Sequence, residues 1–446
     1  MRQFATLLSS LSKPTPRGRM VRGVLANVYD KGAVTSVQLL TIPLLTQHWG
    51  SDGYGIWLML MTVPTFIALS DLGFGTAAGV VVTRCAVDGD YETALNAIHS
   101  TIAFVLGTVC LAALPVLGYA VWIAAFGGAC GGFSPGELAT ATVLITLYAI
   151  VMTQMSIVTV IYRGTHKFAF AMMFAGTLIL LEGGTIALVS TMGRGIALVA
   201  LGILIIRTCG YLLFVSLLKR REPWVAIGVS LASRATIRAL TKPSLAALGL
   251  TISTAVILQG MILALGSTAG AASVAVFGAT RTLSRAPLQL SGMFVRPSIP
   301  ELTRAISGGN QALERRLTRI NLLAALVTTL PFGLAIMAFG APLLDWISGG
   351  HLEAPHLLFV VLALAGVFNA TWTALSAPLL AMNLQAKFSY IYLVLSLAAV
   401  MVVLISGGLL LLAGGLMALV EGAMLVWLVL STQGNYGSKA GGTNGC

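Results

Sequence analysis

The sequence predicts an all-α polytopic membrane protein with about twelve transmembrane helices in two six-helix lobes. Composition is the first of three observations: 57% of the residues are hydrophobic and only 9% are charged, whereas a soluble domain carries about 25% charged residues. The mean hydropathy is +0.93. Second, apolar runs long enough to cross a bilayer recur along the whole chain. Third, the second half repeats landmarks of the first.

Twelve apolar runs meet or approach the roughly 20 residues that a helix needs to span the hydrocarbon core. They lie at about 24–46, 54–83, 98–124, 138–161, 168–192, 196–217, 243–266, 271–300, 319–342, 356–382, 388–408 and 410–432. The chain then divides into an amphipathic basic tail (1–23), an N-terminal lobe (24–217), a basic linker (218–242), a C-terminal lobe (243–432) and a second tail (433–446).

The basic residues are placed asymmetrically. The formal net charge is +12, and nearly all loop Lys and Arg residues fall in alternate connections, whereas the opposite connections contain only Arg194. This pattern is typical of cytoplasmic loops that face anionic lipid, and it places both termini in the cytoplasm. Nucleic acid is therefore not an expected partner.

Loop landmarks indicate an internal repeat with both halves in the same orientation. Such halves are related by a pseudo-twofold axis along the membrane normal, and two similar bundles that face each other are expected to enclose a central cavity. The second spans, 54–83 and 271–300, are longer than the bilayer requires, so they must tilt, bend or project into the cytoplasm. Pro64 with Gly73 and Gly75 offers a bend in the first of them, and Pro287 in the second. The landmarks that recur 220 positions apart are Gly50 and Gly270, Thr83-Arg84 and Thr303-Arg304, and Lys167-Phe168 and Lys387-Phe388.

No residue pattern indicates catalysis, a cofactor or a metal. The five cysteines are scattered without CxxC spacing, so neither disulfides nor a metal site is expected. The longest outer loops carry few groups suited to chemistry, namely Glu137, His351 and Glu353. The chain is therefore not expected to be an enzyme.

Ionisable residues within the predicted spans are the candidate functional residues, because a charge in the membrane interior usually faces a cavity or a partner. The substrate-binding candidates are basic: Lys31, Arg207, Arg281 and Arg285. The candidates for binding a coupling proton or sodium ion are Asp71 and Glu182, and Glu421 is the remaining buried acid.

Two of these arginines are the strongest candidates. Arg281 and Arg285 are four positions apart, so a helix places them on one face, and Arg281 falls near the bilayer midplane. No acid shares their predicted span before Glu301, so a partner must come from another span or from a substrate. Paired guanidinium groups bind phosphate oxygens well, which predicts a pyrophosphate-bearing substrate.

The other candidates have two interpretations. Structural ion pairs of Lys31 with Asp71 and of Arg207 with Glu182 would account for four of the buried charges. Alternatively, the cations line a substrate cavity and the acids bind the coupling ion. Glycines beside Asp71 permit a local helix break, where the carboxylate could also accept a freed backbone amide.

Several motifs of the first two spans and of the loop within 160–168 form a recognisable set, namely Pro43, Gly50, Tyr54-Gly55-Ile56-Trp57 and Asp71-Leu72-Gly73. With these motifs the chain resembles Wzx-type polysaccharide flippases of the multidrug/oligosaccharidyl-lipid/polysaccharide (MOP) exporter superfamily, a resemblance that implies a two-lobed, V-shaped fold. It implies alternating-access export of undecaprenyl-pyrophosphate-linked oligosaccharides across a bacterial inner membrane, for O antigen, capsule or exopolysaccharide. Besides the lipid-linked substrate and membrane lipid, it suggests a polymerase of the same pathway as a partner.

Two other function classes compete with the flippase. A MATE-like drug or cation antiporter of the same superfamily is the first alternative, although such an exporter favours an acidic cavity and the deep charges here are more often basic. A polytopic membrane enzyme of the polysaccharide pathway is the second, and the short loops argue against it.

Overall fold

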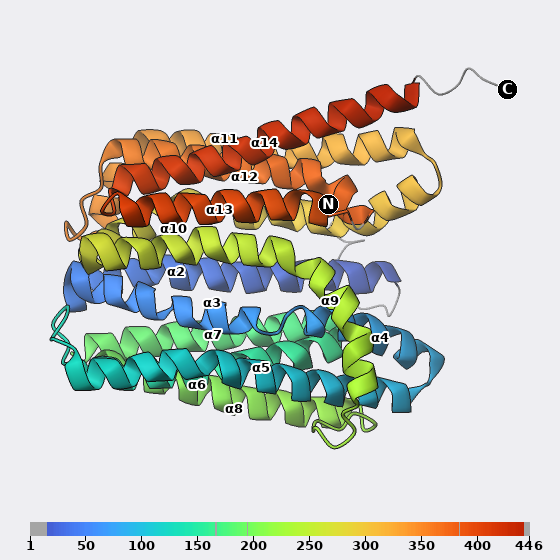
Figure 1. Cartoon of the computed structure of the whole chain (residues 1–446), viewed down its shortest axis with the longest axis horizontal. Coiled ribbons are helices and arrows are strands. Elements are labelled where there is room, and N and C mark those ends of the chain that lie inside the picture. Colours follow the sequence, from blue (N-terminus) through green and yellow to red (C-terminus); the bar gives the residue numbers. More distant parts are fainter. Residues whose placement is uncertain (1–15, 166, 194, 383, 441–446) are drawn as a thin grey trace, which may run out of the picture. The chain divides into compact units, whose positions relative to one another are not determined.

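The computed structural model describes residues 16–165, 167–193, 195–382 and 384–440, and these residues are almost entirely helical (Figure 1). The contacts divide the chain into a first unit, Met1–Leu248, and a second unit, Gly249–Cys446. These units confirm the prediction of an all-α chain with two lobes. Residues 1–15 of the predicted tail lie outside the described residues, whereas the first helix already begins at Pro16.

The helices of the first unit, in chain order, are α2 (Pro16–Leu60), α3 (Thr62–Leu69), α4 (Phe74–Asp88), α5 (Tyr91–Phe126), α6 (Pro135–Gly164), α7 (Phe168–Thr191) and α8 (Ile196–Arg221). Helix α9 (Arg234–Ala255) crosses the boundary between the units. The second unit continues with the π-helix η1 (Val256–Gly260), α10 (Met261–Ser307), α11 (Gln311–Ser348), α12 (His356–Ala381), α13 (Ala386–Ile405) and α14 (Leu410–Ala440).

Two glycines reconcile the helix assignment with the twelve predicted spans. Among the described residues, ten continuous helical stretches are long and apolar enough to cross a membrane. Gly50 (φ 70°, ψ −178°) and Gly270 (φ 82°, ψ 173°) each interrupt one of them. These angles are accessible essentially to glycine alone. The chain reverses direction at Gly50, as Figure 1 shows for α2 and α3. Because Gly50 and Gly270 each divide one stretch into two, the ten helical stretches contain twelve segments that can span the membrane.

The second span is broken as predicted. Helix α3 ends at Leu69 and α4 begins at Phe74, with positive φ at Leu72 (48°) and Gly73 (74°). A Cβ atom at Gly73 would lie 2.7 Å from the carbonyl oxygen of Ser244, so the close approach of α9 also requires glycine there. In α10 the helix continues through Pro287 without a break, and the bend expected at this proline stays a prediction.

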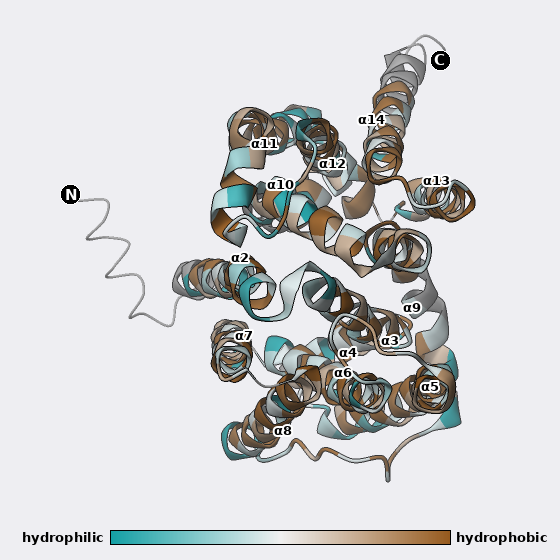
Figure 2. Cartoon of the chain, turned by 90° about the vertical axis from the view of Figure 1, so that its left-hand side faces the viewer, coloured by the Kyte–Doolittle hydropathy of each residue, from teal (hydrophilic) through white to brown (hydrophobic). Residues whose placement is uncertain are grey.

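The fourth predicted span lies at the centre of each unit. In the first unit α6 packs against α3, α4, α5, α7 and α8, and in the second unit α12 packs against α10, α11 and α14. Most of the helical residues are hydrophobic, as the brown colour of the ribbons in Figure 2 shows. Polar side chains on these central helices are therefore held where water is scarce.

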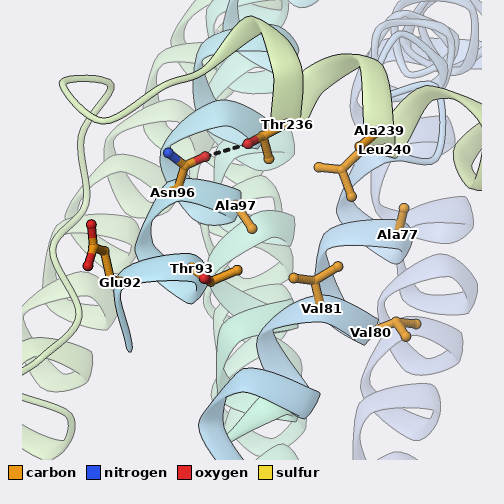
Figure 3. A pocket seen from close by; sticks show the side chains of 10 residues that line it. All are labelled: Ala77, Val80, Val81, Glu92, Thr93, Asn96, Ala97, Thr236, Ala239 and Leu240. Atoms are coloured by element: carbon orange, nitrogen blue, oxygen red, sulfur yellow. Dashed lines mark hydrogen bonds between the residues drawn. The ribbon is translucent and has the colours of Figure 1, made fainter. Parts of the chain in front are cut away.

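The linker between the predicted lobes is attached to the first unit by polar residues of α5. The buried His99 ring accepts the Leu231 amide at Nδ1 (3.1 Å) and lies 2.9 Å from the Ala226 carbonyl through Nε2. Thr236 donates to Asn96 (2.6 Å) beside a cavity of about 590 Å³ between α4, α5 and α9 (Figure 3). Alanine, valine and leucine side chains form most of its lining.

Candidate functional site

Arg207 and Glu182 form a buried ion pair in the first unit. Arg207 Nη2 donates to Glu182 Oε2 over 2.6 Å, and the two side chains are only 8% and 9% exposed. Tyr148 joins them: its hydroxyl donates to Glu182 Oε2 (3.1 Å) and accepts from Arg207 Nη2 (3.1 Å). The three residues come from α8, α7 and α6, so the cluster holds three spanning helices together.

This cluster corresponds to the structural interpretation of Arg207 and Glu182. The charges compensate each other, which reduces the cost of burying either one. Arg207 Nε and Glu182 Oε1 are nevertheless buried without a hydrogen-bond partner among the described residues. The site roles assigned to the two residues from the sequence remain predictions.

Lys31 pairs with its neighbour in the chain rather than with Asp71. Lys31 Nζ lies 3.1 Å from Asp30 Oδ2, and the lysine side chain is 34% exposed. The expectation of a Lys31–Asp71 pair was therefore wrong about the partner. Adjacent helical positions point in different directions, but the flexible lysine stem turns back to the carboxylate.

Asp71 lies in the break between α3 and α4. Its Oδ1 accepts the amide of Gly75 over 2.9 Å, so the carboxylate satisfies one of the amides exposed at the start of α4. This is the backbone-acceptor role considered from the sequence. Within the described part of the chain, no cation lies within ion-pair distance of Asp71.

Arg281 binds the backbone of the π-helix η1. Its Nη1 donates to the carbonyl oxygen of Leu258, and its guanidinium carbon lies 5.9 Å from the centre of the Phe277 ring. A π-helix displaces backbone groups from their usual helical partners, and such turns occur often at functional sites. Arg281 therefore connects the long helix α10 to the irregular turn that precedes it.

Arg285, one turn further along α10, faces Glu421 on α14. Its Nη1 lies 3.9 Å from Glu421 Oε1, well beyond hydrogen-bond distance. The Glu421 side chain is fully buried and that of Arg285 is 17% exposed. The sequence left two alternatives for the partner of Arg285, an acid from another span or a substrate, and the structure places an acid of another span, Glu421, beside it.

Neutral side chains complete the surroundings of Glu421. Oε2 accepts from Trp372 Nε1 (2.6 Å) and from Asn369 Nδ2 (2.9 Å), and Oε1 accepts from the Tyr392 hydroxyl (3.0 Å). Sequence reasoning missed these three residues and Tyr148, because neutral polar groups in apolar spans form no pattern. The available signal was Glu421 itself, a buried acid that needs donors.

The six predicted site residues are thus distributed over separate environments. Arg207 and Glu182 are in direct contact, Lys31 and Asp71 have different partners, and Arg281 and Arg285 share a helix face but contact different elements. The described residues contain no group of three His, Cys, Asp or Glu side chains that could hold a metal ion.

Comparison with solved structures identifies the fold. The chain is similar to the inward-facing conformation of a multidrug resistance MATE family transporter of the MOP superfamily, with a TM-score of 0.75 and 15% identity over 94% of this chain and 99% of that one. An outward-facing MATE transporter of the MOP superfamily matches with a TM-score of 0.62 and 18% identity, over 96% and 97% of the two chains.

A third similar structure is a MOP superfamily transporter from Pyrococcus furiosus, described by a reverse polarity of its binding pocket. It has a TM-score of 0.62 and 16% identity, over 94% of this chain and 96% of that one. No family model and no curated protein matches the chain. The chain therefore has the fold of MATE transporters of the MOP superfamily, while the comparisons give no specific support to the flippase resemblance.

Proposed function

We propose that the chain is a secondary transporter of the MATE type, an antiporter that moves its substrate in exchange for an ion by alternating access. The fold similarity extends over almost the whole chain, and the similar transporters include inward-facing and outward-facing structures. The sequence alone placed this function second to the flippase, and the comparisons support the antiporter better.

The broken second span is the observation that carries the proposal. Secondary transporters bind substrates and coupling ions where spanning helices are discontinuous. The break at Leu72 and Gly73 presents the half-buried carboxylate of Asp71, which has a single backbone hydrogen bond and no ion-pair partner among the described residues. Asp71 is therefore the residue that we assign to the coupling proton or sodium ion.

The antiporter is tested in proteoliposomes that contain the full chain, with ethidium as a cationic probe and an imposed proton or sodium gradient. We expect gradient-driven ethidium movement with the wild type and its loss in Asp71→Asn. Asp88→Asn is the matched control, because Asp88 is an exposed carboxylate at the opposite end of α4. Equal transport by the wild type and Asp71→Asn would exclude Asp71 as the coupling residue.

A flippase for pyrophosphate-linked oligosaccharides is the second candidate. It is favoured by the resemblance in the first two spans and by Arg281 and Arg285 on one face of α10. The discriminating experiment deletes the gene in the host and measures surface polysaccharide and lipid-linked oligosaccharide. Loss of polymer with accumulation of the lipid-linked precursor, without ethidium transport in vitro, would replace the antiporter by the flippase. If neither activity is found, both proposals fail.

A further inference from the structure

The cavity of about 590 Å³ between α4, α5 and α9 has no part in the proposed transport. Its size falls within the roughly 300–1,000 Å³ of pockets that hold small molecules. The described residues that line it come from the end of α4, the start of α5 and the start of α9, and all of them belong to the first unit. The cavity is therefore a candidate ligand site of that unit alone.

The cavity has a polar side and an apolar side. Helix α5 contributes Glu92 and Asn96, whereas α4 contributes Val80 and Val81, and Figure 3 shows Glu92 and Val80 on opposite sides. Val80 is 70% exposed although its side chain is apolar, so the protein leaves this side of the cavity uncovered. Polar groups that fix orientation beside an apolar wall predict a ligand that is itself amphipathic.

The polar side chains of α5 have unused binding capacity. Glu92 is exposed and forms no ion pair with any described residue. Asn96 Oδ1 accepts from the Thr236 hydroxyl (2.6 Å) and from the Ser100 hydroxyl (3.4 Å), which orients the side-chain amide. Its Nδ2 has no hydrogen-bond partner among the described residues. The cavity thus offers a carboxylate to a cation and an amide donor to an acceptor.

The cavity lies at the depth of the lipid head groups. Glu92 is the second residue of α5, and Val81 is about 10 Å of helix from the end of α4 at Asp88. The head-group region of a bilayer extends roughly 5–8 Å beyond the hydrocarbon core on each side. The polar side of the cavity therefore matches the head groups, and the apolar side matches the first part of the acyl chains.

The charges around the cavity match a zwitterion. Glu92 is the one ionisable side chain among the described residues that line it. Arg84 is exposed, lies one turn after the two valines of α4 and forms no ion pair with a described residue. Arg234 and Arg238 are each two positions from Thr236, about 200° around α9, so they face away from the cavity. An ammonium group at Glu92 with a phosphate towards Arg84 complements both charges.

We propose that this cavity binds a phospholipid with a primary ammonium head group, namely phosphatidylethanolamine. Glu92 binds the ammonium group, Asn96 Nδ2 donates to a phosphate or ester oxygen, and the start of one acyl chain packs against Val80 and Val81. Because α9 continues from the first unit into the second, a lipid that contacts α4, α5 and α9 together stabilises the attachment of the linker. The site goes beyond the proposed transport and does not depend on which substrate or ion is moved.

The test measures lipid binding to the purified, delipidated full-length protein in detergent by native mass spectrometry. The probes are dioleoyl phosphatidylethanolamine, phosphatidylcholine and phosphatidylglycerol, which share their acyl chains and differ in the head group. We expect phosphatidylethanolamine to bind most tightly, because the methylated ammonium of phosphatidylcholine cannot donate a hydrogen bond and phosphatidylglycerol carries no cation. Glycerophosphoethanolamine, which lacks acyl chains, should not compete, because it cannot cover the apolar side.

Two variants separate the head group from the acyl chain. Glu92→Gln should weaken phosphatidylethanolamine binding roughly twofold to fivefold, the effect of an exposed ion pair, and should not weaken phosphatidylglycerol binding. Ala239→Trp fills the cavity from an exposed position and should abolish the tight site for all three lipids. Glu314→Gln is the matched control, because Glu314 is the acid in the first turn of α11 as Glu92 is in α5. Glu301→Gln, which breaks the exposed ion pair with Arg304, is a second control.

Trypsin measures the consequence for the linker. Phosphatidylethanolamine should slow cleavage within 219–242 of the wild type, relative to cleavage at Arg315 and Arg316 in the second unit. The lipid should have no such effect on Ala239→Trp, whose cavity is filled. Equal cleavage of the wild-type linker with and without the lipid would exclude the stabilising role.

Other results overturn the lipid site itself. Equal wild-type affinity for the three lipids, or an unchanged preference in Glu92→Gln, would exclude recognition of the ammonium group. Wild-type binding by Ala239→Trp would place the lipid elsewhere on the protein, and competition by glycerophosphoethanolamine would exclude a role of the acyl chain. If Ala239→Trp does not fold, Val80→Trp gives the same test from the exposed side of α4. Because these measurements use no gradient and no ethidium, their failure leaves the test of Asp71 intact.

Discussion

Arg207 and Glu421 occupy the same position in the two halves of the molecule, since each is the twelfth residue of the last spanning helix of its unit. Their contacts Tyr148 and Asn369 also correspond, each being the fourteenth residue of the central helix. The internal repeat therefore preserves a buried polar contact between these two helices. The charge at this position is positive in the first unit (Arg207) and negative in the second (Glu421). The opposite charge comes from Glu182 of α7 in the first unit and from Arg285 of α10 in the second.

The ion pair of Arg207 and Glu182 should make the first unit sensitive to loss of one partner. Glu182→Gln leaves the Arg207 charge buried, and breaking such a pair costs about 3–5 kcal/mol. The double substitution Glu182→Leu with Arg207→Leu removes both charges and should recover most of that stability. Thermal melting of the purified variants measures this, with the exposed-pair variant Glu301→Gln as control. A double variant less stable than the single one would contradict a purely structural pair.

The two reversals at Gly50 and Gly270 should be equally intolerant of a side chain. A Cβ at either position would meet no atom within 4 Å, so the cost arises from backbone strain alone. Gly50→Ala and Gly270→Ala are each expected to lose about 1–3 kcal/mol. Gly89→Asn is the control, because φ 76° and ψ 10° lie in the left-handed region that asparagine tolerates. Similar melting temperatures for all three variants would exclude the strain argument.

His99 should determine how firmly the linker is held. His99→Leu leaves the Ala226 carbonyl and the Leu231 amide without their partner, at a cost of about 1–3 kcal/mol for each group. We expect trypsin to cleave within 219–242 faster than in the wild type. Cleavage at Arg315 and Arg316 in the second unit provides the internal reference. An unchanged ratio of the two cleavage rates would show that other contacts hold the linker.

The caps of α5 and α11 predict a difference in acid stability. Asp90 accepts the Thr93 amide at the start of α5, and Asn310 accepts the Leu313 amide at the equivalent start of α11. The hydrogen bonds with Thr93 lower the pKa of the Asp90 carboxyl below its usual value. The ionised Asp90 cap therefore stabilises the folded protein at a pH above the pKa that this carboxyl has in the unfolded chain. This stabilisation is lost as the pH falls through the lowered pKa of Asp90 in the folded protein.

The experiment exchanges the two caps. Asp90→Asn should match the wild type at neutral pH and lose less stability below about pH 4, because asparagine keeps the cap without titrating. Asn310→Asp should acquire the acid sensitivity that Asp90→Asn loses. Melting temperatures over a pH series measure both. Parallel acid profiles for the wild type and both variants would contradict the assignment.

Much of the fold followed from local features of the sequence. Apolar runs predicted the spans, because each must cross the hydrocarbon core on its own. Gly50 and Gly270 marked the reversals and Gly73 the helix break, because these backbone angles exclude most side chains. Pro287 does not interrupt α10, and the bend expected there stays a prediction.

The candidate site was predicted less completely. The buried charges were found individually, and the contact of Arg207 with Glu182 was among the alternatives. The partner of Lys31 was wrong, because a flexible lysine reaches the adjacent Asp30 more easily than a carboxylate in the next span. The donors Trp372, Asn369 and Tyr392 were missed, because only their geometry distinguishes them from other side chains of apolar helices.

The sequence by itself determined that the chain is a membrane protein, how many segments can span, where the chain must reverse and which charged residues fall within apolar runs. These properties depend on composition and on conformational preferences within a few residues. Tertiary structure decided which charges meet, because the rotation and spacing of packed helices set distances between residues far apart in the chain. It brought Arg207 within 2.6 Å of Glu182 and left Arg285 at 3.9 Å from Glu421. In a medium of low dielectric constant, that difference separates a closed, hydrogen-bonded ion pair from a looser contact between two charges.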